Sequence, residues 1–231
     1  MFLNLNGSEY NWKETEMPME FIKNLGELHK TRSDFFIELL LRHILLSLIA
    51  IVIITVVGVT AGILISKSKK AASVVNGLTN VLYTIPSIAM FGFFVSITGI
   101  GNATAIIALV IYGLLPVIRN TYVGLIEVDD QILEAAVGMG STPWQLLSKI
   151  QFPLALPVII AGIRNMVVMT IALAGIASFI GAGGLGVAIW RGITTNFDEM
   201  TVAGSLLVAL LAFVADGLLG IVEKRLLRRT K

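Results

Sequence analysis

The sequence contains no cysteine and only two histidines, His29 and His43. It can therefore form neither disulfides nor thiolate metal sites, and two histidines supply no cluster for a histidine-rich metal centre. Charged residues are also scarce, at 14% of 231 residues, where soluble domains carry about a quarter. None at all falls between residues 71 and 118. Because about 20 apolar residues already span a bilayer, this run excludes a soluble domain and predicts a membrane protein.

Nucleotide-binding and catalytic motifs are missing too. The sequence has no Gly-x-x-x-x-Gly-Lys-Ser/Thr phosphate loop, and Gly181-x-Gly183 lacks the strand–turn–helix setting of a dinucleotide site. No Ser–His pair and no cluster of His, Asp and Glu falls at bilayer depth. We therefore expect no enzyme activity and no cofactor on this chain, and a membrane enzyme is disfavoured as a function class.

Apolar side chains dominate instead, with 56% hydrophobic residues and a mean hydropathy of +0.88. Five stretches are long enough to cross a bilayer, at about residues 44–65, 74–97, 104–126, 154–180 and 200–222. Each is too long and too evenly apolar for a barrel strand, which would alternate. The predicted fold class is an all-α integral membrane protein with about five transmembrane helices in residues 39–223. A polar tail, residues 1–38, precedes them and a basic tail, residues 224–231, follows.

The basic residues orient the chain, because Lys and Arg collect on the cytoplasmic side of membrane proteins. In one of the two orientations, almost all basic residues near the ends of the spans lie on the cytoplasmic side. They are Lys67, Lys69, Lys70, Lys149, Lys224, Arg225, Arg228, Arg229 and Lys231. We therefore expect a multi-pass protein of the cell membrane with its N-terminus outside and its C-terminus in the cytoplasm. The polar start carries no cleavable signal peptide. Phe21, Leu25 and Leu28 share one helical face, which indicates an interfacial helix or, equally, a loosely ordered extension.

The cytoplasmic loop of residues 129–153, between the third and fourth spans, has its own helix signals. Asp129 or Asp130 can cap a short helix, which Gly138 and Gly140 would end. A second helix restarts at Thr142-Pro143-Trp144-Gln145, with Thr as N-cap, Pro at the first position and Gln completing a capping box. Pro153 is expected to end this helical hairpin and begin the fourth span. Such a hairpin suits docking into a partner's groove, although a loop folded over the lipid headgroups stays open.

The same loop resembles a known family. Glu134-Ala135-Ala136, then Gly140, then Ile150-Gln151-Phe152-Pro153 match the "EAA…G…I-LP" signature of ABC importer permeases in spacing, with Phe152 where Leu is usual. Five spans and an outside N-terminus are also similar to the methionine-permease-like fold. The resemblance implies that the hairpin is a coupling helix docking on an ATPase subunit through these residues: Glu134, Ala135, Ala136, Gly140, Ile150 and Pro153.

That resemblance also implies the partners. Two copies of an ATP-binding subunit would bind ATP and Mg, close around the nucleotide and pull the docked hairpins, so that the spans rock. An extracellular solute-binding protein would deliver solute, and a second permease subunit, the same or a related chain, would complete the pore. An ion-coupled secondary transporter is the alternative class, but five spans form no equal inverted halves and no acidic proton relay is present.

Further segments resemble the osmoprotectant permeases, which carry glycine betaine, carnitine or choline. They are Leu41-Arg42-His43, Tyr83-Thr84-Ile85-Pro86-Ser87, Arg119-Asn120-Thr121 and the run from Ser178 to Gly186. The alternative that the solute is another small amine or an amino-acid-like compound stays open. By the resemblance, a tight aromatic cage belongs to the solute-binding protein, so the permease needs only a low-affinity path.

Two groups of residues are candidates for the pathway or gate. Pro86 interrupts the second span, with Thr84 and Ser87 beside it, and predicts either a kink lining a cavity or local packing strain. The segment that holds Gly181, Gly183 and Gly184 is too rich in glycine for a stable helix. It predicts either a turn near the external gate or a plain loop.

Two charges and a pair of glycines complete the candidates. Arg164 and Asp216 lie at comparable depth in the inner half of their spans, where an unpaired charge is costly. They are candidates for an intramembrane ion pair, within the chain or across a dimer. The alternative is that Arg164 snorkels and Asp216 meets water. Gly58-x-x-x-Gly62 permits close helix contact and is a candidate dimer surface.

Overall fold

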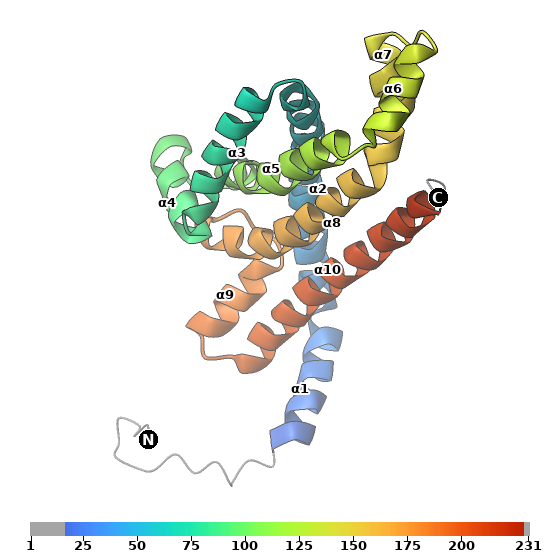
Figure 1. The fold of residues 1–231 in the computed structure, drawn as a ribbon. Helices are drawn as coiled ribbons and strands as arrows, with labels where there is room; N and C mark the ends of the chain where they lie inside the picture. The colour runs from blue at the N-terminus through green and yellow to red at the C-terminus, as the bar shows by residue number, and fades with distance from the viewer. Residues whose placement is uncertain (1–16, 229–231) are drawn as a thin grey trace, which may run out of the picture.

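The computed structural model describes residues 17–228, and every regular element among them is a helix (Figure 1). The first 16 residues of the predicted polar tail and residues 229–231 of the basic tail lie outside this range. The elements are α1 Met17–Thr31, α2 Ser33–Ser66, α3 Lys69–Thr84, α4 Ser87–Thr98, α5 Asn102–Ile126, α6 Asp130–Gly138, α7 Pro143–Leu146, the π-helical η1 Leu147–Gln151, α8 Phe152–Ala177, the 3₁₀ turn η2 Ser178–Ile180, α9 Gly186–Thr194 and α10 Asp198–Leu227.

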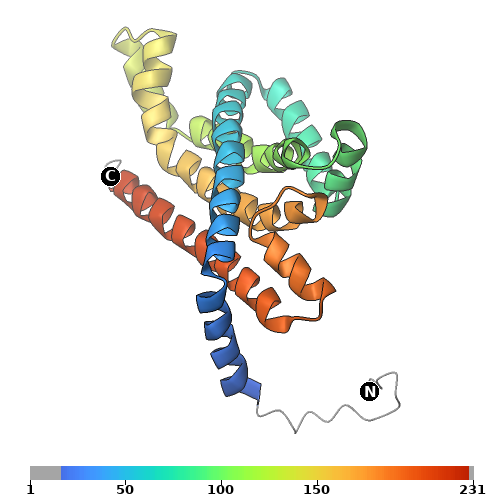
Figure 2. The same ribbon diagram turned by 180° about the vertical axis from the view of Figure 1, so that it is seen from behind.

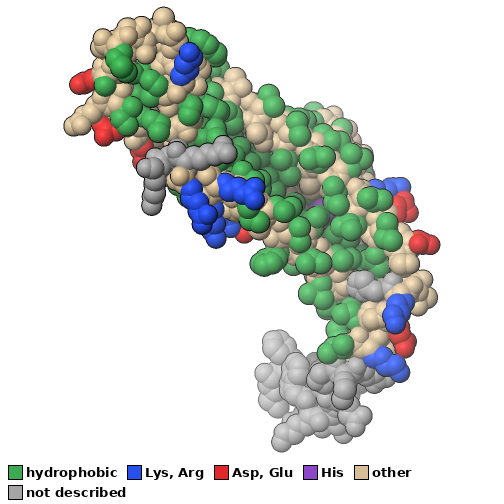
Figure 3. Space-filling view, turned by 90° about the vertical axis from the view of Figure 1, so that its right-hand side faces the viewer, with side chains coloured by type: hydrophobic (Ala, Val, Ile, Leu, Met, Phe, Trp, Pro, Cys, Tyr) green, Lys and Arg blue, Asp and Glu red, His purple; other side chains and the backbone are tan. Residues whose placement is uncertain are grey.

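Within residues 17–228, four helical segments are long and apolar enough to cross a membrane. They are Ser33–Ser66, Asn102–Ile126, Pro143–Ile180 and Asp198–Leu227, and the bent pair α3–α4 makes a fifth if it counts as one span. Hydrophobic side chains cover the middle of the molecule, while many acidic and basic side chains lie toward its two ends (Figure 3). The all-α membrane fold predicted from the sequence is thereby confirmed.

Helix α2 is longer than its predicted span and runs along much of the molecule (Figure 2). At 1.5 Å per residue, its 34 residues reach about 51 Å, against about 30 Å for the hydrocarbon core. The helix is therefore longer than the apolar layer is thick, and its first turns carry Asp34 and the Glu38–Arg42 ion pair of 2.7 Å.

The second apolar stretch differs most from the expectation of one span over residues 74–97. It forms two helices, α3 and α4, which meet at 96°. Ile85 and Pro86 separate them with extended backbone, at ψ values of 126° and 136°. A proline removes one helical donor and disfavours helical geometry in the residue before it, so Pro86 produces a break where a kink was the milder expectation.

The centre of the fold is built from α2, α5 and α8, which approach closely through small residues. A Cβ atom at Gly58 would lie 2.8 Å from Val117 of α5, and one at Gly62 would lie 2.7 Å from Thr121 Cγ2. The close helix contact that Gly58-x-x-x-Gly62 permits is therefore present, and because α5 of the same chain covers both glycines it is made within the chain and not across a dimer.

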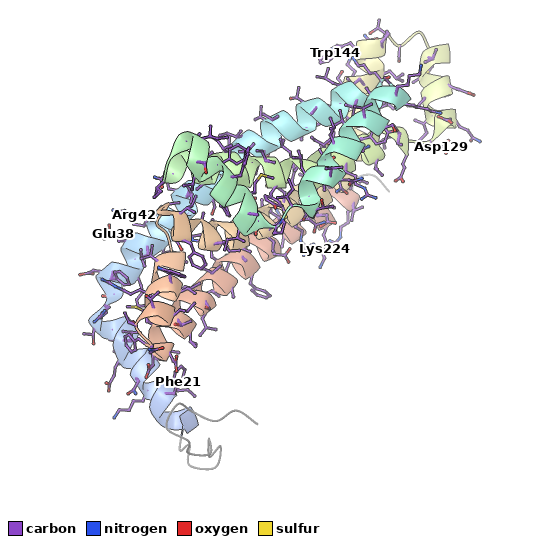
Figure 4. All side chains as sticks on the ribbon, turned by 90° about the vertical axis from the view of Figure 1, so that its left-hand side faces the viewer. Phe21, Glu38, Arg42, Asp129, Trp144 and Lys224 are labelled. Atoms are coloured by element: carbon purple, nitrogen blue, oxygen red, sulfur yellow. The ribbon has the colours of Figure 1, made fainter. Side chains whose placement is uncertain are left out.

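Helix α1 packs against α10 and α2 at the end opposite the α6–α7 hairpin (Figures 1 and 4). Leu28 is buried there with Phe36, Leu185 and Met200, and Leu25 packs against the same cluster. An Asn24 amide nitrogen lies 3.5 Å from the Glu199 carboxylate of α10. The amphipathic face expected in this segment therefore faces protein, at least along its last turns.

Candidate coupling hairpin, outer loop and charge cluster

The predicted helical hairpin is present and its ends are capped as the residue types dictate. The Asp129 carboxylate accepts a hydrogen bond of 2.8 Å from the Gln131 N–H and begins α6. Thr142 and Gln145 form the capping box of α7, at 3.3 Å from the Gln145 N–H to Thr142 Oγ1 and 3.0 Å from the Thr142 N–H to Gln145 Oε1. Pro143 occupies the first turn. Each cap satisfies a helix donor that the helix itself leaves unpaired.

Gly140 makes the reversal between the two helices. Its φ is +84°, in the left-handed region. The Gly140 N–H donates to the Val137 carbonyl at 2.9 Å and the Ser141 N–H to the Ala136 carbonyl at 3.1 Å, which is the bonding pattern of a Schellman cap. Gly138 is only the last residue of α6, so Gly140 alone is required to end the helix.

The hairpin continues into the membrane as one rod. Pro153 was expected to end α7, but α7 passes through the π-helical turn η1 into α8 without a break. Phe152 donates its N–H to the Leu147 carbonyl five residues earlier. A proline in a regular helix clashes with the carbonyl four residues before it, and the wider turn re-spaces the carbonyls just ahead of Pro153. The expectation of a helix end at Pro153 is therefore wrong.

The hairpin exposes apolar side chains beyond the rest of the protein (Figure 4). Met139 is 80% exposed and Trp144 72% exposed. Glu134 and Ala135 lie on the exposed side of α6, whereas Ala136 is buried and Ile150 half-buried. A hollow of about 560 Å³ lies between the end of α2 and α7–η1, lined by Lys67, Trp144 and other residues. Exposed large apolar residues between charged ones mark interaction surfaces.

The first group of pathway candidates lies at the α3–α4 break. Thr84 and Pro86 are exposed and Ser87 is half-buried. The Thr84 hydroxyl donates to the Val81 carbonyl of its own helix at 2.7 Å. The Tyr112 hydroxyl of α5 donates to the Ile85 carbonyl, so a buried helix holds the break in place.

The second group forms a glycine-rich loop elsewhere in the fold. Gly181, Gly183 and Gly184 have φ values of +77°, +76° and +81°, which side chains with a Cβ rarely adopt. The loop contacts the turn after α4, where the Gly101 N–H donates to the Ile180 carbonyl at 3.0 Å. It meets α4 at the end remote from the break, so the two candidate groups do not form one site within this chain.

His43 of α2 fixes this loop, a role that the Leu41-Arg42-His43 resemblance did not specify. The ring is fully buried. The Leu185 N–H donates to Nδ1 at 3.3 Å, and Nε2 lies 3.0 Å from the Ile171 carbonyl of α8. Because Nδ1 accepts, Nε2 carries the proton and donates. One imidazole therefore joins α2, α8 and the loop, and Gly184 is small enough to lie against it.

The structure brings Arg164 of α8 and Asp216 of α10 together. Nε and one terminal nitrogen of Arg164 donate to the two Asp216 oxygens at 2.5 and 2.6 Å, and the other terminal nitrogen donates to Glu223 at 3.0 Å. Gly220 lies beneath the guanidinium, where a Cβ would be 3.2 Å from Cζ. Sequence reasoning missed Glu223, although its spacing of seven residues from Asp216 places both carboxylates on one helix face.

Among residues 17–228, no group of three or more His, Asp or Glu residues is placed to hold a metal ion. The described residues form an exposed capped hairpin, a continuous helical rod that joins it to α8, and a helix bundle around that rod. A family model for the binding-protein-dependent transport system inner membrane component matches residues 54–228. The chain belongs to this family.

Three curated permeases show the extent of the likeness. The carnitine transport permease protein OpuCD of Listeria monocytogenes is 40% identical over 209 residues, which are 90% of this chain and 94% of that protein. The glycine betaine/carnitine/choline permease OpuCD of Bacillus subtilis is 38% identical over 209 residues, 90% of this chain and 91% of its own. The ergothioneine transport permease/binding protein EgtU of Helicobacter pylori is 44% identical over 164 residues, covering 71% of this chain but 30% of that protein.

The fold of this permease is also known from solved structures. An inward-facing structure of the MetNI methionine ABC transporter matches 85% of this chain and 98% of its own with a TM-score of 0.76 at 19% identity. The predicted membership among ABC importer permeases of the methionine-permease-like fold is thereby confirmed. The roles assigned to single residues of the hairpin, break and loop remain predictions.

Proposed function

We propose that this permease carries a quaternary-ammonium osmoprotectant, namely glycine betaine, carnitine or choline, into the cell. The observation that carries the solute class is the 38–40% identity to carnitine and glycine betaine/carnitine/choline permeases across 90% of the chain. An extracellular solute-binding protein delivers the solute, and a second permease subunit, identical or related, completes the pore. A different small solute is favoured only by the likeness to the ergothioneine permease, at 44% identity over 71% of the chain.

Energy comes from two copies of a partner ATPase that hold ATP and Mg, and the hairpin is the docking element. Its apolar tip, Met139 and Trp144, is exposed, and a side chain caps the N-terminus of each of its two helices. A preorganised helical hairpin loses little conformational freedom on docking. The π-helical junction supports the same role, because it connects the docked element to α8 without a flexible loop.

The hairpin faces the cytoplasm and the N-terminus faces outward. In support, the hairpin lies at the same end of the molecule as the α2–α3 turn and the end of α10 (Figure 1). These segments carry the basic residues Lys67, Lys69, Lys70, Lys224 and Arg225. The absence of cysteine from the chain allows a direct test with single cysteines. An impermeant thiol reagent applied to intact cells should label Ile22→Cys and spare Met139→Cys; the reverse pattern overturns the orientation.

The decisive experiment measures uptake of radiolabelled betaine, carnitine and choline in cells that lack other osmolyte systems. Uptake should require ATP and the ATPase subunit, and should persist when the ion gradient is collapsed. Glu134→Lys should abolish both uptake and co-purification of the ATPase. The exposed Glu127, at the end of α5, supplies the matched control, and Glu127→Lys should retain both. Absence of uptake for all three solutes would refute the solute assignment.

A further inference from the structure

Tyr83 has an unusual position for a membrane tyrosine. It lies in the last turn of α3, 13 residues beyond Lys70, or about 20 Å along the helix axis. Membrane tyrosines usually sit at the headgroup level, where the hydroxyl meets water. Tyr83 instead lies in the uncharged stretch between residues 71 and 118, and yet 46% of the residue is exposed.

Two contacts fix the ring in place. The Tyr83 hydroxyl donates to Met169 Sδ of α8 at 3.0 Å. The ring also meets Tyr112 of α5 in an edge-to-face contact, with centroids 5.9 Å apart and an angle of 60°. Tyr112 is itself held by its hydrogen bond to the Ile85 carbonyl. Contacts with α5 and α8 therefore hold the Tyr83 ring in one orientation, while nearly half of the residue stays exposed.

The helix end beside this ring adds negative potential. Among residues 17–228, no backbone N–H donates to the Tyr83 or Thr84 carbonyl, because the chain leaves the helix at Ile85 and Pro86 carries no N–H. Free carbonyls at a helix C-terminus carry about half a negative charge. Broken helices are tolerated at membrane depth where they line a cavity or are buried in protein, and in transporters such ends coordinate cations.

The combination fits one ligand chemistry. A trimethylammonium group cannot donate a hydrogen bond, so it is recognised by aromatic faces and partial negative charge. Tyr83 and the end of α3 offer both, in a stretch with no fixed charge that would trap the ion. We propose that Tyr83 is a low-affinity station for the quaternary ammonium group of the transported solute. This inference rests on the proposed osmoprotectant function.

Fluorination of the ring tests the station without removing it. The complete transporter should carry phenylalanine, then mono-, di- and trifluorophenylalanine, at position 83, because each fluorine weakens the negative ring face while ring size changes little. Tyr83→Phe should keep most of the betaine uptake. The maximal uptake rate should then fall stepwise, by about tenfold at three fluorines, while the half-saturating concentration set by the solute-binding protein stays constant.

Phe93 is the matched control. It lies on α4, is 61% exposed and makes a similar edge-to-face contact with Phe94 at 5.3 Å, but it lies five residues before the end of its helix instead of in the last turn. The same fluorinated series at position 93 should leave uptake unchanged. Equal slopes at both positions would show that the effect is not specific to Tyr83 and would overturn the station. A fall in the yield of assembled complex without a fall in rate per complex would show that Tyr83 packs against a second subunit, and would overturn the station too.

The outcomes separate this inference from the proposed function. If the parent transporter takes up betaine and fluorination at position 83 leaves the uptake rate unchanged, the role of Tyr83 is refuted and the osmoprotectant assignment stands. A parent protein that takes up no quaternary amine refutes the assignment, and the station with it.

Discussion

Two glycines in the hairpin, two residues apart, allow a controlled test of the coupling element. Gly140 has φ +84° and Gly138 is the last residue of α6, and no atom outside their immediate neighbours lies within 4 Å of a Cβ built at either position. Alanine would therefore meet no steric obstacle at either site, and only backbone conformation distinguishes them. The left-handed conformation costs about 1–2 kcal/mol for a residue with a Cβ, whereas alanine in a helix is favoured over glycine by about 0.5–1 kcal/mol.

We expect Gly140→Ala to weaken binding of the ATPase subunit by about 5- to 30-fold, because the docking conformation must be regained at that cost. Gly138→Ala should bind as tightly as the parent or slightly more so. Asparagine visits the left-handed region more readily than alanine, so Gly140→Asn should recover part of the loss. The assay is the dissociation constant between purified ATPase and detergent-solubilised permease, with uptake measured in parallel. Equal effects of alanine at positions 138 and 140 would refute the argument that backbone conformation at Gly140 shapes the docking element.

Three further predictions follow from local geometry. Reversing either charge of the Arg164–Asp216 pair should abolish uptake, and the double exchange should restore a measurable part of it; failure of the double exchange would show that Arg164 and Asp216 are not coupled. Thr142→Ala removes the side-chain cap of α7 and costs about 1 kcal/mol, so the affinity of the permease for the ATPase should fall by about fivefold, which the same binding assay measures. Gly186→Ala places a Cβ against the Gly175 carbonyl and should lower the yield of folded permease in size-exclusion chromatography, whereas Gly217→Ala, with open space around the new methyl group, should match the parent.

The features that sequence reasoning predicted well are local. The capping box of Thr142 and Gln145 and the cap at Asp129 involve residues two or three positions apart, so their residue types alone indicate the geometry. The apolar stretches predicted the spans for the same reason, since length and composition decide whether a helix can cross a bilayer. Gly140 was identified as a helix stop, but only the hydrogen-bond pattern shows that Gly138 is not one.

Long-range contacts were the features that could not be predicted. The partner of Gly58 and Gly62 is α5, which a small-residue spacing cannot specify. His43 contacts a carbonyl 128 residues away, and Glu223 completes the Arg164 cluster across two helices. At Pro86 the residue type indicated a perturbation, but its size, a 96° bend, depends on how α5 holds the break through Tyr112.

Close contacts between helices indicate which parts of this permease move together. α8 is continuous with the hairpin, and it meets α5 at backbone distance: a Cβ at Gly124 would lie 3.1 Å from the Ala155 carbonyl, and one at Gly162 would lie 2.9 Å from the Pro116 carbonyl. Such contacts leave little space between the two helices to absorb a displacement. α10 is joined to the same rod through Arg164. If a partner ATPase pulls the hairpin, as proposed, α5, α8 and α10 should therefore move together as one body.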